Sequence, residues 1–252
     1  MGVGALLGRG QVAEVYQWGD DVIKLYRPGQ GKAQAFAEAS HLALLEGRSL
    51  PVPAVRGVVA VEGRWGVVME RAPGRPMLGA SLADVRPAVV LLVRLQWQLH
   101  QQPGSGLPAL KDRLRRDILA AGQLRADERT GLMRQLQALP AGDRLCHGDF
   151  HLGNIMVAQD RYSVVDWLDA TQGAPEADAC RSYLLMLHHM PELATDYLDA
   201  YLRTSGSTGG AVLGWLGVLA GARLSENVPD ENERLLVLVR ESIARSLHDQ
   251  AR

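Results

Sequence analysis

The chain has 252 residues, of which 47% are hydrophobic and 22% charged, a balance typical of a globular protein built as one bilobed unit or two small domains. Its 27 basic and 28 acidic side chains give a formal net charge of -1, so the basic excess typical of nucleic-acid or membrane-surface binding is missing. The two cysteines, Cys146 and Cys180, form no Cys-x-x-Cys pair, which argues against a disulfide framework or a zinc ribbon. With no apolar run of membrane-span length and no signal-peptide pattern, we expect a cytoplasmic monomer or small homo-oligomer.

The first seventy residues predict strands arranged around one helix. Strands are expected over residues 2–7, 11–17 and 21–25, with a glycine turn at Gly8 and Gly10 and a tight turn at residues 18–20. Residues 32–48 are rich in Ala, Leu and Glu, which favours a helix. Two more apolar runs, residues 55–61 and 65–69, are joined by Glu62-Gly63-Arg64 and predict a second hairpin.

A cluster of helix and strand breakers at residues 72–76 marks a change of character. We therefore predict two lobes, residues 1–71 and residues 72–252. Beyond the boundary, apolar residues at helical spacing (Val85, Val89, Leu92, Leu95 and Leu99) mark a long helix. Further helices are expected over residues 110–121, 127–139, 176–190, 192–202, 212–224 and 231–247.

Chemistry concentrates between His147 and Asp166. The polar loop His147-Gly148-Asp149 leads to Asn154, and two short apolar runs follow, which predict a hairpin centred on Asp160. In that register Asn154 faces Asp166. An amide oxygen and a carboxylate side by side suit Mg²⁺, which binds through few protein oxygens together with substrate phosphates. Asp149, just upstream, is placed to accept the proton of an attacking hydroxyl.

Two other interpretations of this segment use the histidines. His147 and His151 have the i,i+4 spacing of zinc ligands on a helix, although Gly148 and Gly153 disfavour a helix there. A metal phosphoesterase would combine His147, Asp149 and Asp166, and it would hydrolyse its substrate without a nucleotide.

The motif His147-Gly148-Asp149 with Asn154, followed by Val164-Val165-Asp166-Trp167, resembles the catalytic loop and second metal motif of the aminoglycoside phosphotransferase and choline kinase-like family. The resemblance implies an α+β, protein-kinase-like fold with a small antiparallel-sheet N-lobe carrying one helix and a larger, mainly helical C-lobe. It implies that Asp149 is the catalytic base or orients the hydroxyl, and that Asn154 and Asp166 hold Mg²⁺.

The N-terminal part carries the same resemblance. Lys24 in Val22-Ile23-Lys24-Leu25 looks like the strand lysine that contacts the nucleotide phosphates, and Glu38 looks like the helix glutamate that holds it, with Glu46 as the competitor. Gly8 and Gly10 stand where a glycine loop would cover the phosphates. The segment Met69-Glu70-Arg71 resembles the hinge under the base, where backbone groups of Glu70 and Arg71 would bind it. Asp178 resembles an aspartate that braces the catalytic loop.

The function implied is Mg²⁺-dependent transfer of the γ-phosphoryl group of ATP or GTP to a hydroxyl of a small molecule, with an aminoglycoside or another antibiotic as one acceptor class. Metabolites such as choline or homoserine are the alternative acceptors, and a pseudokinase-type regulator is the alternative class. We expect the acceptor near Trp167, Asp169 and the C-terminal helices. An acidic cluster (Glu226, Asp230, Glu231 and Glu233) would attract a polyamine, unless it only opens a helix, where acids are favoured.

Overall fold

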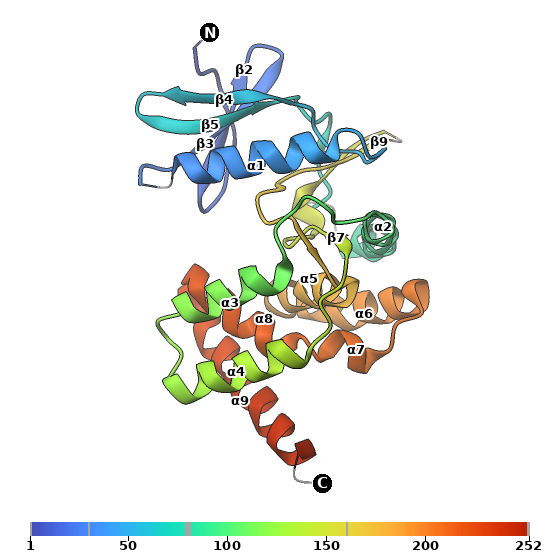
Figure 1. The fold of residues 1–252 in the computed structure, drawn as a ribbon. Helices are drawn as coiled ribbons and strands as arrows, with labels where there is room; N and C mark the ends of the chain where they lie inside the picture. The colour runs from blue at the N-terminus through green and yellow to red at the C-terminus, as the bar shows by residue number, and fades with distance from the viewer. Residues whose placement is uncertain (1, 30, 79–81, 160, 251–252) are drawn as a thin grey trace. The chain divides into compact units, whose positions relative to one another are not determined.

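The computed structural model describes residues 2–29, 31–78, 82–159 and 161–250 (Figure 1). The chain forms two compact units. The sheet unit comprises Met1–Ala80 and Leu152–Ala170, and the helical unit comprises Ser81–His151 and Thr171–Arg252. This division differs from the expected boundary after residue 71, because residues 152–170 return to the sheet unit. The contacts that tie them there include strand pairing with residues 75–76 and a hydrogen bond from the Val164 amide to the Pro51 carbonyl at 2.7 Å.

The sheet unit is built on a five-stranded antiparallel sheet. Its strands are β1 (Leu6–Arg9), β2 (Ala13–Trp18), β3 (Asp21–Tyr26), β4 (Val55–Val61) and β5 (Arg64–Met69), in the order β1-β2-β3-β5-β4. Two-residue turns close both predicted hairpins, with Trp18 paired to Asp21 and Val61 to Arg64. Positive φ at Glu62 and Gly63 (50° and 78°) is the geometry that such tight hairpins require.

The two faces of this sheet have different partners. Ile23, Leu25 and Val68 form an apolar cluster with Trp18 and Tyr16 on one face. Helix α1 (Lys32–Leu45) packs on the strands β4 and β5, and it buries Ala35, Leu42 and Leu45 (Figure 1). Because side chains alternate along a strand, Lys24 and Tyr26 of β3 point away from the apolar cluster, and both contact Glu38 of α1.

A smaller sheet completes the sheet unit. It contains β6 (Arg75–Pro76), β8 (Ile155–Ala158) and β9 (Arg161–Val164), in the order β6-β8-β9, and the 3₁₀ turn η1 (Leu152–Asn154) leads into β8. Asp160, the expected centre of this hairpin, lies outside the described residues. The residues that close the hairpin on either side, Ala158 and Arg161, are paired.

The helical unit packs its helices around two short strands. The helices are α2 (Leu82–His100), α3 (Leu110–Ala120), α4 (Ala126–Ala138), α5 (Pro175–His189), α6 (Pro191–Ser205), α7 (Gly209–Leu213), α8 (Leu216–Arg223) and α9 (Pro229–Gln250), with the 3₁₀ turn η2 (Leu224–Glu226). Strands β7 (Arg144–Cys146) and β10 (Thr171–Gly173) pair antiparallel. Among the residues described, none of the helices has the length and apolarity needed to cross a bilayer.

Most predicted elements are present, and the expected α+β composition is confirmed. Of the α2 stripe, Val89, Leu92, Leu95 and Leu99 are buried, and the side chain of Val85 lies outside those described. The single helix predicted over residues 212–224 was wrong: the chain breaks between α7 and α8 at Gly214 and Trp215. Glycine is a weak helix former, and the fully buried Trp215 favours the bend that places its ring in the core.

Gly74 offers a test of how closely β6 and β8 approach. Its φ is +91°, and a Cβ placed there would lie 1.9 Å from the Val157 carbonyl oxygen. Gly63 has a similar φ of +78° but nothing within 4 Å of its Cβ position. We expect Gly63→Ala to destabilise by about 1–2 kcal/mol through backbone strain alone, and Gly74→Ala by about 1–3 kcal/mol more through the clash. Urea unfolding measures both, and equal losses would contradict the close approach.

Candidate active site

The sheet unit holds a buried charge cluster around Lys24. The ammonium of Lys24 donates to Glu38 Oε1 at 2.8 Å and to Asp166 Oδ1 at 2.7 Å. The lysine and glutamate side chains are 9% and 1% exposed, whereas Asp166 is 43% exposed. Burial by itself would lower the pKa of Lys24, but the charges of Glu38 and Asp166 outweigh it and raise the pKa above its usual value. Lys24 therefore stays cationic, with one partner buried and the other open to solvent.

Glu38, and not Glu46, is the partner of the lysine. Glu46 lies past the end of α1, and its carboxylate accepts a hydrogen bond from the Val55 amide. Glu38 is fixed from a second side, because the Tyr26 hydroxyl donates to its other oxygen at 2.5 Å. Tyr26 was not predicted as part of the site, although its position two residues after Lys24 on β3 puts both side chains on one face. Burial, then the charge of Glu38, raises the pKa of Tyr26, so the hydroxyl keeps its proton.

The hairpin register was predicted wrongly by one residue. Ile155 pairs with Val164 and Ala158 with Arg161, so the residue facing Asn154 is Val165, whose amide donates to the Asn154 carbonyl at 2.9 Å. Asp166 follows, two residues beyond β9, with φ of +66°, a left-handed backbone conformation that non-glycine residues rarely adopt. The turn of the chain at this residue carries its carboxylate to Lys24.

Asn154 and Asp166 still stand at the same end of the β8–β9 hairpin. Asn154 immediately precedes β8 and is 9% exposed, and Asp166 lies two residues beyond β9. Amide and carboxylate oxygens are hard ligands, and the partly exposed Asp166 leaves room for water and phosphate oxygens. This donor set fits Mg²⁺, and the adjacent ammonium of Lys24 fits the phosphates that accompany the ion.

The glycine turn and the predicted hinge are both in the sheet unit. Gly8 lies within β1 opposite Val15, and the Gly10 amide donates to the Ala13 carbonyl at 2.9 Å, which closes the turn into β2. Met69 ends β5 and is buried.

Of the backbone groups expected to bind a base, the Glu70 amide is already used. It donates to the Ala54 carbonyl at 2.8 Å, and the Glu70 carboxylate accepts from the Ala54 amide in return. The carbonyl oxygen of Glu70, together with the backbone of Arg71, is what this segment can offer a base. Both residues are exposed.

The helical unit holds the catalytic-loop motif. Gly148 has φ of +83°, which allows the loop its sharp turn after the buried His147. The Asp149 carboxylate lies 3.5 Å from Arg181 Nη2 and 3.4 Å from His151 Nε2. Burial would raise the pKa of Asp149, but the hydrogen bond from His151 and the charge of Arg181 hold the pKa well below its usual value. Asp149 is therefore an ionised carboxylate, suited to orienting a hydroxyl.

Asp178 braces this loop, as the resemblance implied. Its Oδ1 accepts from the Gly148 amide at 2.7 Å, and its Oδ2 accepts from His100 Nε2 at 3.0 Å and Gln96 Nε2 at 3.1 Å. Burial opposes ionisation, yet the hydrogen bond and charge of His100 lower the pKa of Asp178 to about 2. Ser182, one turn along α5, donates to the Phe150 carbonyl at 2.7 Å and fixes the other side of the loop.

Arg181 links the loop to the C-terminal helices, and it was missed from the sequence. Its Nε donates to the Gly148 carbonyl at 3.3 Å and its Nη2 donates to Glu226 at 2.9 Å. The sequence contained an indication of this role. Arg181 stands three residues after Asp178 on a helix, so it shares the face that meets the loop.

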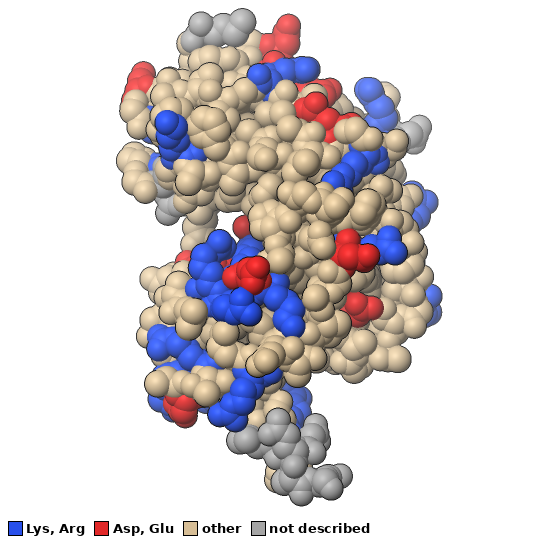
Figure 2. All heavy atoms as spheres, viewed as in Figure 1, with Lys and Arg blue, Asp and Glu red and all other residues tan. Residues whose placement is uncertain are grey.

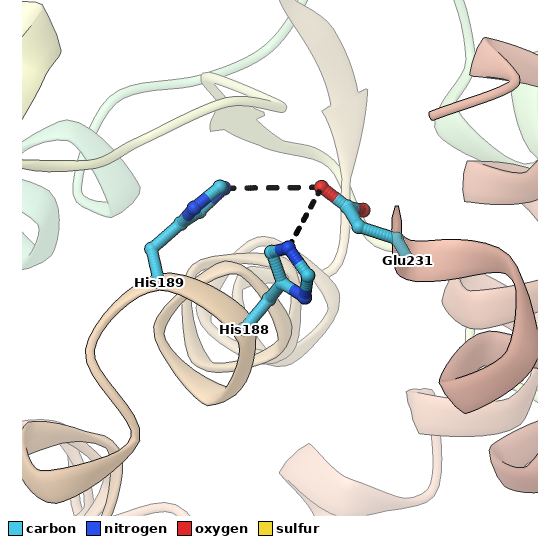
Figure 3. Close-up of side chains that lie close together, drawn as sticks. All are labelled: His188, His189 and Glu231. Carbon is cyan, nitrogen blue, oxygen red and sulfur yellow. Dashed lines mark ion pairs between the residues drawn. The ribbon is translucent and has the colours of Figure 1, made fainter. Parts of the chain in front are cut away.

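The chain of charges continues from Glu226 through Arg223 to Glu231. Arg223 contacts Glu226 and binds both oxygens of Glu231 at 2.7 and 2.8 Å. Figure 3 shows His188 and His189, at the end of α5, turned toward Glu231 Oε1, with Nε2–Oε1 distances of 3.9 and 3.8 Å. These three residues lie close enough to surround a cation, but Arg223 already occupies both oxygens of the glutamate.

Three expectations about acceptor binding change with the structure. Trp167 is fully buried, donates to the Val164 carbonyl and accepts from His41, so it is a core residue and not part of an acceptor surface. Asp169 lies in the sheet unit, near enough to Tyr26 to raise its pKa. Two members of the acidic cluster, Glu226 and Glu231, are paired with arginines, and Asp230 and Glu231 lie in the first turn of α9.

The zinc interpretation of His147 and His151 is not supported. Residues 147–151 form no helix, the Nδ1 of His147 accepts from the Asp149 amide at 3.2 Å, and its ring packs edge-on against Phe150. His147 is thus a buried support of the loop.

A lysine–glutamate pair on a five-stranded sheet, an Asn/Asp hairpin beside it and a braced His-Gly-Asp loop in a helical unit together define a phosphotransferase of protein-kinase-like fold. The chain belongs to the phosphotransferase enzyme family, whose model matches residues 4–216. This membership confirms the predicted class, a kinase of small molecules. No curated protein matches the chain.

Solved structures show the same fold at low sequence identity. A thermostable mutant of aminoglycoside phosphotransferase APH(4)-Ia, in a ternary complex with ADP and hygromycin B, aligns with a TM-score of 0.69 and 14% identity, covering 96% of this chain and 93% of that one. APH(3'')-Id from Streptomyces rimosus gives 0.62 and 20%, covering 83% and 89%. Amicoumacin kinase hAmiN, in complex with AMP-PNP, Ca²⁺ and Ami, gives 0.64 and 15%, covering 96% and 88%.

The depressed pKa of Asp149 is directly measurable. Replacing Arg181 by Gln removes a positive charge beside the carboxylate, so the pKa of Asp149 should rise toward the ordinary value of about 3.9. The native carboxylate stabilises the fold above about pH 4, and that contribution fades as the pH falls through its lower folded pKa. The ¹³C chemical shift of the Asp149 carboxyl, titrated in both proteins, gives the two values. Arg115→Gln is the control, because Arg115 pairs only with the exposed Asp112 among the described residues. An unchanged pKa in Arg181→Gln would contradict the assignment.

Proposed function

We propose that this protein transfers the γ-phosphoryl group of ATP or GTP, with Mg²⁺, to a hydroxyl group of a small molecule. The observation that carries the proposal is the contact of Lys24 with Asp166 at 2.7 Å. A phosphate bound by the lysine would lie beside a carboxylate that can hold its metal ion, so the sheet unit gathers the groups that a nucleoside triphosphate requires.

Each residue has a defined task in this proposal. Lys24, held by Glu38, binds the phosphates, and Asn154 and Asp166 would hold Mg²⁺, which neutralises charge that develops on the phosphoryl oxygens. The carbonyl of Glu70 and the backbone of Arg71 would bind the base, with Met69 beneath it and the turn at Gly8 and Gly10 over the phosphates. Asp149 would orient the acceptor hydroxyl for in-line attack.

The low pKa of Asp149 shapes its part in the reaction. A carboxylate held ionised by Arg181 and His151 is a weak proton acceptor in the ground state. Its main contribution is then to align the hydroxyl, and the proton moves late, as the bond to phosphorus forms. Such a late transfer suits a loose transition state in which little charge develops on the attacking oxygen.

The acceptor is a small molecule with a hydroxyl group, and the candidates are an aminoglycoside or another antibiotic, or a metabolite such as choline or homoserine. The solved structures of antibiotic phosphotransferases described above support an antibiotic acceptor only through their similar fold. Neutralisation of Glu226 and Glu231 by arginines gives no support to a polyamine attracted by that cluster. A pseudokinase-type regulator is disfavoured, because Lys24, Glu38, Asp149, Asn154 and Asp166 are all present.

Replacement of Asp149 by Asn tests the catalytic role. We expect turnover to fall by roughly 10²–10⁴-fold, because the hydroxyl loses the carboxylate that orients it. Nucleotide affinity should stay within about twofold, because the residues proposed to bind the nucleotide do not include Asp149. ADP release and nucleotide titration measure the two quantities. Asp143→Asn is the matched control, as its carboxylate is 80% exposed and pairs with Arg144. Full activity of Asp149→Asn would contradict the role.

A nucleotide screen tests the class itself. ATP or GTP with Mg²⁺ should raise the melting temperature. At a nucleotide concentration a hundredfold above Kd, binding adds about 2.7 kcal/mol to the free energy of unfolding. ADP release over a panel of antibiotics and amino-alcohols then separates an active kinase from a pseudokinase. If no nucleotide stabilises the protein, the proposed function is wrong.

A further inference from the structure

A pocket opens beside the catalytic loop within the helical unit. It is a small hollow that is open to solvent. The backbone of Gly148 and the side chain of Arg181 form its inner end, and Arg181 contacts Asp149. Leucines of α3 and α8 (Leu110, Leu114 and Leu219) form an apolar wall. The pocket therefore lies next to the carboxylate that would orient an acceptor hydroxyl.

The carboxylates around this pocket are neutralised by arginines. Glu226 pairs with Arg181 at 2.9 Å and also with Arg223. Asp117 of α3 pairs with Arg113 at 3.4 Å and with Arg116 at 3.2 Å. A third lining carboxylate, Asp178, has a side chain with no exposed surface and is bound to His100. An incoming ammonium group would have to displace a guanidinium from one of these carboxylates.

One guanidinium of the lining, in contrast, keeps an unused amino group. Arg181 is only 6% exposed, and among the described residues its Nη1 amino group donates to none, because its hydrogen bonds use Nε and Nη2. A buried guanidinium with an unused amino group lining a pocket is a ready donor to an anion. Figure 2 shows Lys and Arg side chains gathered over α3, which carries Lys111, Arg113, Arg115 and Arg116 against Asp112 and Asp117. This surplus makes the electrostatic potential at that helix favourable to anions.

We propose that this pocket binds the acceptor, and that it selects hydroxyl compounds carrying a carboxylate or phosphate group over neutral and cationic ones. This rests on the proposed function. Arg181 and Arg113 bind the anionic group, and the leucine wall covers the carbon chain. Of the acceptors considered above, homoserine is a zwitterion with a carboxylate beside its ammonium group, whereas choline and the aminoglycosides are cations without a carboxylate. In the reaction, the acceptor oxygen bonds to the γ-phosphorus, the bond from that phosphorus to the β–γ bridging oxygen breaks, the nucleoside diphosphate leaves, and the hydroxyl proton is released.

Four compounds that share one diol separate the effect of charge from that of the hydroxyl. They are glycerol, glycerate, glycerol 3-phosphate and 3-amino-1,2-propanediol, offered to the whole protein with Mg²⁺ and AMP-PNP for binding by calorimetry, and with Mg²⁺ and ATP for ADP release. We expect at least one of the two anions to bind about tenfold or more tightly than glycerol, and the amine to bind no better than glycerol. The preferred anion distinguishes a carboxylate acceptor from a phosphate acceptor.

Substitutions in α3 test whether the preference for anions arises in this pocket. Arg113→Gln should weaken binding of the preferred anion about tenfold without changing nucleotide affinity, and Arg113→Lys should restore part of it. Arg115→Gln removes the same charge from the same helix but outside the pocket, and it should weaken anion binding by no more than about twofold, because exposed charges are screened by salt.

Two results would overturn the inference: no preference for either anion over glycerol, or tighter binding of the amine. An equal loss of anion binding in Arg113→Gln and Arg115→Gln would also count against it. If Mg²⁺ and nucleotide bind normally in those experiments, the selectivity fails and the kinase function stands. If nucleotide itself does not bind, the kinase function fails first.

Discussion

One buried cation organises the sheet unit. The Lys24 ammonium joins three segments that are far apart in the sequence: strand β3, helix α1 through Glu38, and the residue that follows β9 through Asp166. A buried charge must be paired, and removal of one partner of such a pair typically costs about 3–5 kcal/mol. The same requirement that stabilises the unit therefore places the lysine beside Asp166, the carboxylate that we propose to bind the metal ion. Tyr26 adds to this by holding the second oxygen of Glu38.

The helical unit fixes the catalytic loop by a different principle. Its polar groups are satisfied on both sides of the loop: Asp178 binds the Gly148 amide, Arg181 binds the Gly148 carbonyl, and Ser182 binds the Phe150 carbonyl. All three come from one face of α5. A loop held through its backbone can present Asp149 without relying on the flexibility of that side chain, and the charge of Arg181 keeps the carboxylate ionised. Positioning and electrostatics are thus supplied by the same helix.

Most of the longer helices and strands could be predicted from the sequence, although the helix expected over residues 212–224 is divided into α7 and α8. Alternation and turn residues predicted both N-terminal hairpins, and the family resemblance singled out Lys24, Glu38, Asp149 and Asp166 as candidate site residues. Structural details that depend on a single residue were harder to predict from the sequence. The pairing of Ala158 with Arg161 differs by one residue from the predicted register, so Asn154 faces Val165, and the left-handed φ of Asp166 follows from no sequence pattern. The Arg181–Glu226–Arg223 chain joins three elements through tertiary packing, which no local pattern encodes.

The central claim is that Lys24 and Asp166 form a site for a metal-bound triphosphate. Titration of ATP and GTP with and without Mg²⁺, for the native protein and for Asp166→Ala, tests it most directly. In the native protein, Mg²⁺ should strengthen binding of the preferred nucleotide, because Asp166 holds the ion beside the phosphates. In Asp166→Ala that Mg²⁺ dependence should be lost, while the melting temperature identifies any general loss of fold. An Mg²⁺ dependence of unchanged size in a folded Asp166→Ala protein would contradict the account.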